Sequence, residues 1–225
     1  MKLPLLLVNF KAYEKSTGLN AVTLAKIHDE AAKETGLSIA IAVSAVDIAA
    51  VCVAVSIPVF AQHIDPVDFG AKTGFIPPKL MKNLGATGTL LNHSEHQISD
   101  DVLQKSIEMA HAAGLFVVAC ANTAEKGAQV MKFKPDLIAV EPSELIGGDI
   151  SVSKAQPDVI KKSVELIGKE KVLVGAGVKN SEDVRIALEL GAQGILVASG
   201  VTNSSDPKKT ILDLIAPFKV ASMVK

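Results

Sequence analysis

A chain of 225 residues, 48% of them hydrophobic, is long enough to bury one large core. Aromatic residues make up only 4% and Trp is absent, so aliphatic side chains must fill that core, as parallel strands and covering helices require. The formal net charge of −1 gives no electrostatic case for nucleic acid or an anionic membrane as a partner. Cys52 and Cys120 lie in apolar stretches without metal-ligand spacing, so we expect free thiols rather than a disulfide or a metal site.

Eight short apolar runs follow one another along the chain and predict eight buried parallel strands. Each run is three to six residues long. The predicted strands are residues 5–8, 39–43, 59–64, 89–91, 115–119, 137–140, 172–174 and 195–198.

Stretches with an apolar residue every three or four positions lie between these runs and predict helices, for example residues 100–113, 123–133, 157–168 and 181–190. Ser181 is a predicted N-cap, and Gly114, Gly168 and Gly191 are predicted helix stops. Eight strand-plus-helix units share the chain at about 28 residues each, the length that such a unit needs. Doubly wound sheets usually stop at five or six strands, so we predict an α/β fold, a single-domain (β/α)8 TIM barrel spanning residues 1–225.

The segment of residues 37–61 contains one charged residue, Asp47, and is long enough to cross a bilayer. Asp47 at the centre of such a span would cost about 2.5 to 3.5 kcal/mol on insertion scales. The pattern of strand, small-residue helix at residues 46–55 and second strand favours a buried β-α-β unit. With no signal peptide evident in the first ten residues, we expect a cytoplasmic protein without a membrane partner.

Polar residues and glycines stand where five of the predicted strands end. In a parallel barrel these ends meet at one mouth, which is where barrel enzymes hold their chemistry. The strand ends are Asn9-Phe10-Lys11, Asn92-His93-Ser94-Glu95, Glu141-Pro142, Gly175-Ala176-Gly177 and Ala198-Ser199-Gly200.

The same phrases resemble the triosephosphate isomerase family in order and over essentially the whole chain: VNFKAY, TLLNHSE, VEPSELIGG, VGAG and VASGV. SELIG and NHSE look most like its short archaeal branch. The resemblance implies interconversion of dihydroxyacetone phosphate and D-glyceraldehyde 3-phosphate through an enediolate.

The resemblance also implies the catalytic roles. Glu141 would be the general base, His93 the neutral electrophile that polarises the carbonyl, and Lys11 the fixed cation. Glu95 would hold Lys11 through an ion pair. Ser94 and Glu95, if they open a short helix, would disfavour the imidazolium form of His93.

Substrate binding is expected from the same strand ends and from a lid that follows Glu141. Backbone N–H groups beside glycines can approach a phosphate dianion closely. The predicted binding residues are Asn9, Lys11, Ile146, Gly147, Gly177, Ala198, Ser199 and Gly200. No metal and no organic cofactor is expected, and the only partners expected are the triose phosphate and further copies of this chain, in a dimer or tetramer.

Two regions of the chain, the lid and the predicted subunit contact, depart from the family pattern. Relatives carry Gly in the lid where this chain has Asp149, which accepts fewer backbone angles, so we expect the lid hinge to open differently. Relatives also carry Pro where this chain has Ser151, a change without an interpretation from sequence. Phe75 and His96-Gln97 replace both halves of the family's intersubunit ion pair, although Thr73 is still placed, by resemblance, to reach a partner's site.

Two alternatives remain open on sequence alone. A different phosphate-binding barrel enzyme, such as an aldolase with a Schiff base on Lys11 or a phosphoribosyl isomerase, would share the glycine-rich strand ends. A non-catalytic sugar-phosphate binder would also share them, although it has no reason to keep a base at Glu141.

Overall fold

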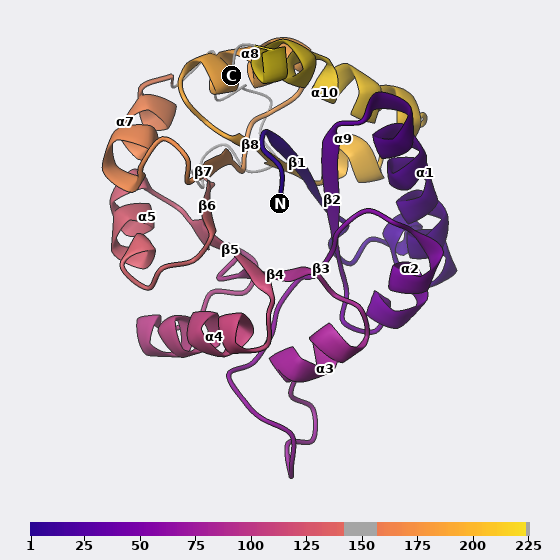
Figure 1. Cartoon of the computed structure of the whole chain (residues 1–225), viewed down its shortest axis with the longest axis vertical. Coiled ribbons are helices and arrows are strands. Elements are labelled where there is room, and N and C mark those ends of the chain that lie inside the picture. The colour runs from indigo at the N-terminus through magenta and orange to yellow at the C-terminus, as the bar shows by residue number, and fades with distance from the viewer. Residues whose placement is uncertain (142–156, 224–225) are drawn as a thin grey trace.

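Eight parallel strands form a closed barrel in which each strand pairs with the next and β8 pairs with β1 (Figure 1). This computed structural model describes residues 1–141 and 157–223 of the chain. The strands are β1 (Leu5–Asn9), β2 (Ser38–Val43), β3 (Val59–Ala61), β4 (Gly88–Leu91), β5 (Phe116–Ala121), β6 (Leu137–Val140), β7 (Val172–Val174) and β8 (Gly194–Val197).

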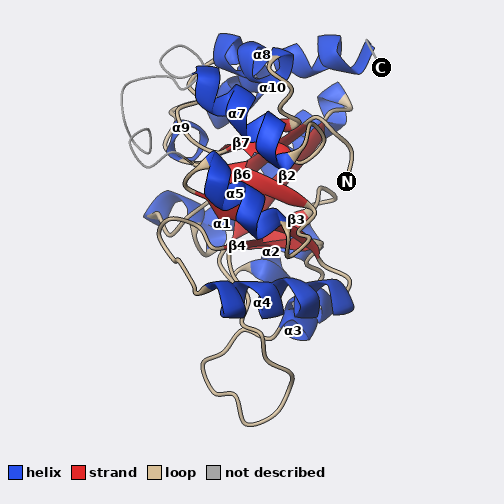
Figure 2. Cartoon of the chain, turned by 90° about the vertical axis from the view of Figure 1, so that its left-hand side faces the viewer, coloured by secondary structure: helices blue, strands red, loops and turns tan. Residues whose placement is uncertain are grey.

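Helices connect the strands and ring the barrel, as both views show (Figure 1 and Figure 2). In the described residues they are the 3-10 helix η1 (Glu14–Ser16), α1 (Leu19–Thr35), α2 (Ile48–Ala54), α3 (Pro78–Asn83), α4 (Asp100–Ala112), α5 (Ala124–Met131), α7 (Pro157–Ile167), α8 (Ser181–Glu189), α9 (Ser199–Thr202) and α10 (Pro207–Met223). The predicted fold class, a (β/α)8 barrel, is confirmed.

The strands are apolar on both faces because both faces are buried. On β1, Leu5 and Leu7 belong to the small cluster that fills the barrel, whereas Leu6 and Val8 belong to the large cluster between the barrel and the helices. Successive side chains of a strand point to opposite faces, so a strand enclosed on both sides reads as a continuous apolar run. This is why the strands could be found from apolar runs without alternation.

Seven of the eight predicted strands agree with the structure to within two residues at each end. The prediction for the third, residues 59–64, is wrong at its end, because β3 stops at Ala61. Ile64 is fully buried but lies outside the sheet. The chain then enters a loop whose two ends are joined by Asp65 and Ile76. The backbone N–H of Asp65 donates to the Ile76 carbonyl at 2.9 Å, and the backbone N–H of Ile76 donates to the Asp65 carboxylate at 2.7 Å. An apolar run indicates burial and not strand pairing, so the predicted strand extended past the end of β3.

The segment of residues 37–61 forms β2, α2 and β3, the β-α-β unit that was predicted. Among the helices described, none combines the length and the apolar character needed to cross a membrane.

The N-cap of α8 lies one residue before the predicted cap. Asn180, not Ser181, is the N-cap, and its side-chain oxygen accepts a hydrogen bond from the backbone N–H of Asp183 at 3.1 Å. Both residue types are favoured at this position, so sequence preference alone did not choose between them. The three predicted glycine stops follow α4, α7 and α8, each with a positive φ.

Candidate active site

The carboxyl ends of five strands surround a cavity of about 340 Å³. Its lining comes from the ends of β1, β4, β6, β7 and β8, which are far apart in sequence. The lining residues are Asn9, Lys11, His93, Glu141, Gly175, Ala176, Gly177, Val178, Lys179, Leu196, Val197, Ala198, Ser199 and Gly200.

The barrel therefore brings together every candidate site residue of the described chain except Glu95, which borders the cavity through its contact with Lys11. Ile146 and Gly147 were also predicted to bind substrate, and these two lie outside the described residues.

Lys11 is held in an unusual backbone conformation just past the end of β1. Its φ is 51°, a left-handed value that is rare for residues other than glycine. The buried side chain of Asn9 accepts the backbone N–H of Lys11 at 2.9 Å, and the Gln62 amide donates to the Lys11 carbonyl at 2.9 Å and to Asn9 at 3.1 Å. Three hydrogen bonds thus fix the backbone that carries the ammonium group.

The ammonium group of Lys11 forms an ion pair with Glu95, with 2.7 Å between Nζ and Oε1. The Lys11 side chain is 15% exposed, so most of its stem is buried while the charge faces the cavity and its carboxylate partner. The contact therefore places the side chain of Lys11 beside a carboxylate at the edge of the cavity.

His93 presents one ring nitrogen to the cavity and the other to the backbone. The N–H of Glu95 donates to Nδ1 at 3.1 Å, so Nδ1 carries the lone pair and the proton of the neutral ring is on Nε2. The Glu95 carboxylate lies 3.6 Å from Nδ1, too far for a hydrogen bond that would compete. Residues 93–96 form a turn rather than the short helix considered from sequence, and the N–H that reaches the ring comes from this turn.

Glu141 follows β6 and is 4% exposed, with its Oε1 3.3 Å from Nε2 of His93. Burial raises the pKa of the Cys120 thiol well above its ordinary value, and the charge of Glu141 and a hydrogen bond to Glu141 raise it further. The thiol therefore stays protonated beside the carboxylate. We assigned Cys120 no role from sequence, because nothing local to β5 indicates a contact with a residue 21 positions away.

Gly175 leaves the space that the Glu141 side chain occupies. A Cβ at position 175 would lie 2.5 Å from Cγ of Glu141, a distance that real side chains do not adopt. The backbone N–H of Gly175 donates to the Val140 carbonyl at 2.8 Å, which holds the ends of β6 and β7 together. The glycine is needed here for space beside the carboxylate.

The ends of β7 and β8 bring small residues to the wall of the cavity. Gly177 has a φ of 69°, and Ala198 leads into α9, whose first residues are Ser199 and Gly200. The first N–H groups of a helix have no partner within the helix, so such a wall can accept an anion. Among the described residues, no group of three or more His, Cys, Asp or Glu side chains could hold a metal ion.

The structure describes Phe75 and His96 among the positions that depart from the family pattern. His96 packs against His63 with 4.3 Å between ring centroids, and Phe75 and Thr73 are exposed on the loop that protrudes between β3 and α3 (Figure 2). Asp149 and Ser151 lie outside the described residues.

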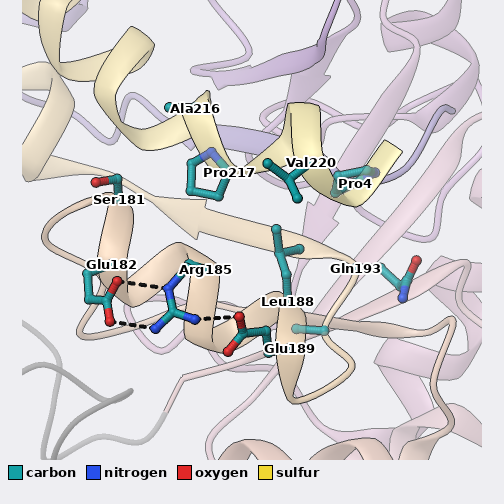
Figure 3. A pocket seen from close by; sticks show the side chains of 11 residues that line it. Pro4, Ser181, Glu182, Arg185, Leu188, Glu189, Gln193, Ala216, Pro217 and Val220 are labelled. Atoms are coloured by element: carbon teal, nitrogen blue, oxygen red, sulfur yellow. Dashed lines mark hydrogen bonds and ion pairs between the residues drawn. The ribbon is translucent and has the colours of Figure 1, made fainter. Parts of the chain in front are cut away.

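A second cavity of about 550 Å³ lies between α8 and α10 (Figure 3). Pro4, Leu188, Pro217 and Val220 contribute apolar surface to it, and on its rim Arg185 is paired with Glu182 and Glu189. The charges on its rim pair with one another, and no residue predicted to act on a substrate lines it. The smaller cavity is therefore the candidate active site.

At the mouth of a parallel barrel, one cavity is lined by a buried carboxylate, an imidazole and an ammonium group. This arrangement is typical of acid–base enzymes built on a (β/α)8 barrel. The family model described as triosephosphate isomerase matches residues 4–217. The chain therefore belongs to the triosephosphate isomerase family, and by family it is an isomerase.

Curated relatives agree with the family match. The triosephosphate isomerase of Methanobacterium bryantii is 42% identical over 95% of this chain and 96% of its own length. That of Metallosphaera sedula is 43% identical over 96% of each chain, and that of Saccharolobus solfataricus is 41% identical over 96% of each.

Proposed function

We propose that this protein interconverts dihydroxyacetone phosphate and D-glyceraldehyde 3-phosphate through an enediolate, without a cofactor. One observation carries the proposal: in a chain of this family, Lys11, His93 and Glu141 line the same cavity, with 3.3 Å between the imidazole of His93 and the carboxylate of Glu141.

In the proposed reaction, Glu141 removes a proton from the carbon next to the carbonyl group and returns it to the neighbouring carbon. His93, with its proton on Nε2, donates a hydrogen bond to the carbonyl oxygen where negative charge develops. Lys11 supplies a fixed positive charge toward the enediolate and the phosphate. The proton of the neighbouring hydroxyl group also passes to the former carbonyl oxygen, and Nε2 of His93 is placed to relay it. Each proton that is removed is thus returned to the same substrate, and the reaction needs no oxidant or reductant.

For the phosphate group we propose a cradle of backbone N–H groups at Gly177, Ala198, Ser199 and Gly200, with Asn9 ordering the Lys11 segment. Ile146 and Gly147 would complete it from the lid. The ion pair between Lys11 and Glu95 supports an electrostatic role for Lys11 over a Schiff base, because a Schiff base needs a neutral amine.

A coupled assay on both triose phosphates tests the function directly. We expect turnover in both directions without added metal and in the presence of a chelator. Borohydride treatment with dihydroxyacetone phosphate should leave the protein unmodified. If the protein binds triose phosphate tightly but does not turn it over, it is a non-catalytic binder. If borohydride traps the substrate on Lys11, the protein uses the Schiff-base chemistry of an aldolase.

We further propose that residues 1–225 act as one barrel domain, in a cytoplasmic homo-oligomer. The support for association is the protruding loop, on which Phe69 and Phe75 are more than half exposed. Thr73 on this loop would reach the site of a second copy.

A further inference from the structure

Asn92 separates β4 from the catalytic histidine and has no role in the chemistry described so far. It is buried and has a φ of 57°. Both ends of its side-chain amide are engaged: Nδ2 donates to the backbone carbonyl of Cys120 at 3.1 Å, and Oδ1 accepts the backbone N–H of Ile98 at 3.0 Å.

The bond to Ile98 closes the segment 92–98 into a loop, and the bond to Cys120 fixes the start of this loop to the end of β5. His93 and Glu95 are inside the loop. Within it, the N–H of His96 donates to the His93 carbonyl at 2.8 Å and the N–H of Glu95 donates to the His93 ring. The direction of the imidazole therefore depends on the shape that the Asn92 side chain imposes on the loop.

Cys120 also contacts the proposed base. Its carbonyl receives the Asn92 amide and its thiol hydrogen-bonds to Glu141. The electrophile and the base are thus held to the same residue of β5 from two sides, and the resulting distance between His93 Nε2 and Glu141 Oε1 is 3.3 Å.

The backbone conformation alone does not explain an asparagine here. Glycine adopts a positive φ with less strain, and the chain also tolerates lysine at such a position, since Lys134 has a φ of 62°. What asparagine adds is an amide that donates in one direction and accepts in the other. A buried amide is tolerated when both ends have partners, as they do here.

We propose that Asn92 is a positioning residue for the isomerisation: its amide holds the His93 loop against β5, so that the Nε2–H of His93 and the carboxylate of Glu141 face adjacent atoms of one substrate. This inference rests on the proposed function. Asn92 does not touch the substrate and acts through the placement of His93.

The test compares two glycine substitutions at positive φ. Asn92→Gly keeps the backbone conformation and removes both side-chain hydrogen bonds, whereas Lys134→Gly keeps the conformation at a site remote from the cavity. We expect kcat of Asn92→Gly to fall about 10- to 100-fold, because a small misplacement of a catalytic group has effects of this size. KM and the inhibition constant of inorganic phosphate should stay within about threefold, because the phosphate cradle is on β7 and β8. Lys134→Gly should retain the wild-type kcat.

A second pair of variants separates positioning from stability. In a His93→Gln background, Asn92→Gly should lower kcat by less than about threefold further, because there is no imidazole left to place. Asn92→Asp keeps the acceptor for Ile98 but sets a carboxylate oxygen against the Cys120 carbonyl, so we expect a loss of kcat as large as that of the glycine variant. If the glycine variant fails to fold, kcat of Asn92→Asp tests the inference in its place.

Two results would overturn the inference while leaving the proposed function intact: an active wild-type protein whose Asn92→Gly and Asn92→Asp variants keep kcat within about threefold, or a loss of kcat that persists undiminished without His93. A wild-type protein without isomerase activity would refute the proposed function itself.

Discussion

Glu141 is the residue whose protonation the proposed reaction changes. Replacing it by Gln keeps the size and shape of the side chain but removes its ability to accept a proton. We expect kcat of Glu141→Gln to fall about 10²- to 10⁴-fold in the coupled assay, with KM changed far less.

An exposed carboxylate provides the control for this variant. Glu108 on α4 accepts a hydrogen bond from Gln104 at the surface, and Glu108→Gln should leave kcat unchanged. A loss of only a few-fold in Glu141→Gln would contradict the assignment of the base.

His28 illustrates how one buried residue sets the response of the fold to pH. The side chain is fully buried on α1, its Nδ1 contacts the Leu24 carbonyl at 2.8 Å, and its ring packs against Phe10. Burial lowers the pKa of His28 from 6.5 to about 4. The folded protein therefore holds this imidazole neutral under conditions in which the unfolded chain protonates it.

The direction of the effect follows from proton binding. Between pH 6.5 and about 4 the unfolded state binds more protons at His28 than the folded state, so the free energy of unfolding falls as pH decreases through this window. Above pH 6.5, His28 does not lower the free energy of unfolding. By about pH 4 its protonation in the unfolded state lowers this free energy by on the order of 3 kcal/mol. We expect His28→Leu to show a smaller pH dependence of unfolding by urea over this range, and superimposable profiles for the two proteins would refute this prediction.

The seam between β8 and β1 is the element on which closure of the barrel depends. Gly194 pairs with Leu5 there, with a φ of 139°, and a Cβ at this position would lie 2.0 Å from the Leu5 carbonyl oxygen. Neither backbone can move without breaking the pairing of two strands. A side chain at this position therefore conflicts with the closed barrel.

We expect Gly194→Ala to lower the free energy of unfolding by about 3 kcal/mol or more, from backbone strain and overpacking together. Equilibrium unfolding in urea measures the change. Gly200→Ala is the matched control, because a Cβ at Gly200 would meet no atom within 4 Å and the residue has no left-handed φ. Equal stability of the two variants would show that the seam can relax.

The oligomeric state depends on the surface of the whole molecule. Phe69 is 57% and Phe75 is 51% exposed on a loop that protrudes from an otherwise compact barrel (Figure 1). Two large apolar side chains so placed are typical of a contact surface. We expect sedimentation velocity to give a mass of at least twice that of the chain, and we expect the Phe69→Ser, Phe75→Ser double variant to sediment as a single chain. A wild-type protein that sediments as one chain while fully active would refute the oligomer.

Several features of the fold and site could be predicted because they depend on short, local stretches of sequence. Residues 137–140 and 172–174 were predicted as strands with the same bounds that the structure has, since continuous apolar runs of that length indicate strands buried on both faces. Once eight such strands form a barrel, strand ends must share a mouth, and this was enough to expect Lys11, His93 and Glu141 around one cavity.

What the sequence determined by itself is therefore burial, strand count and the residues at each strand end, because these depend on local periodicity and on turn chemistry. Only the tertiary structure decided which of these residues contact one another. The Asn92 bond to Cys120 spans 28 positions and the Gln62 bond to Asn9 spans 53, and neither leaves a local pattern. Such contacts exist because closure of the barrel brings separate strand ends within hydrogen-bonding distance, and the angle and register of closure are properties of the whole set of strands.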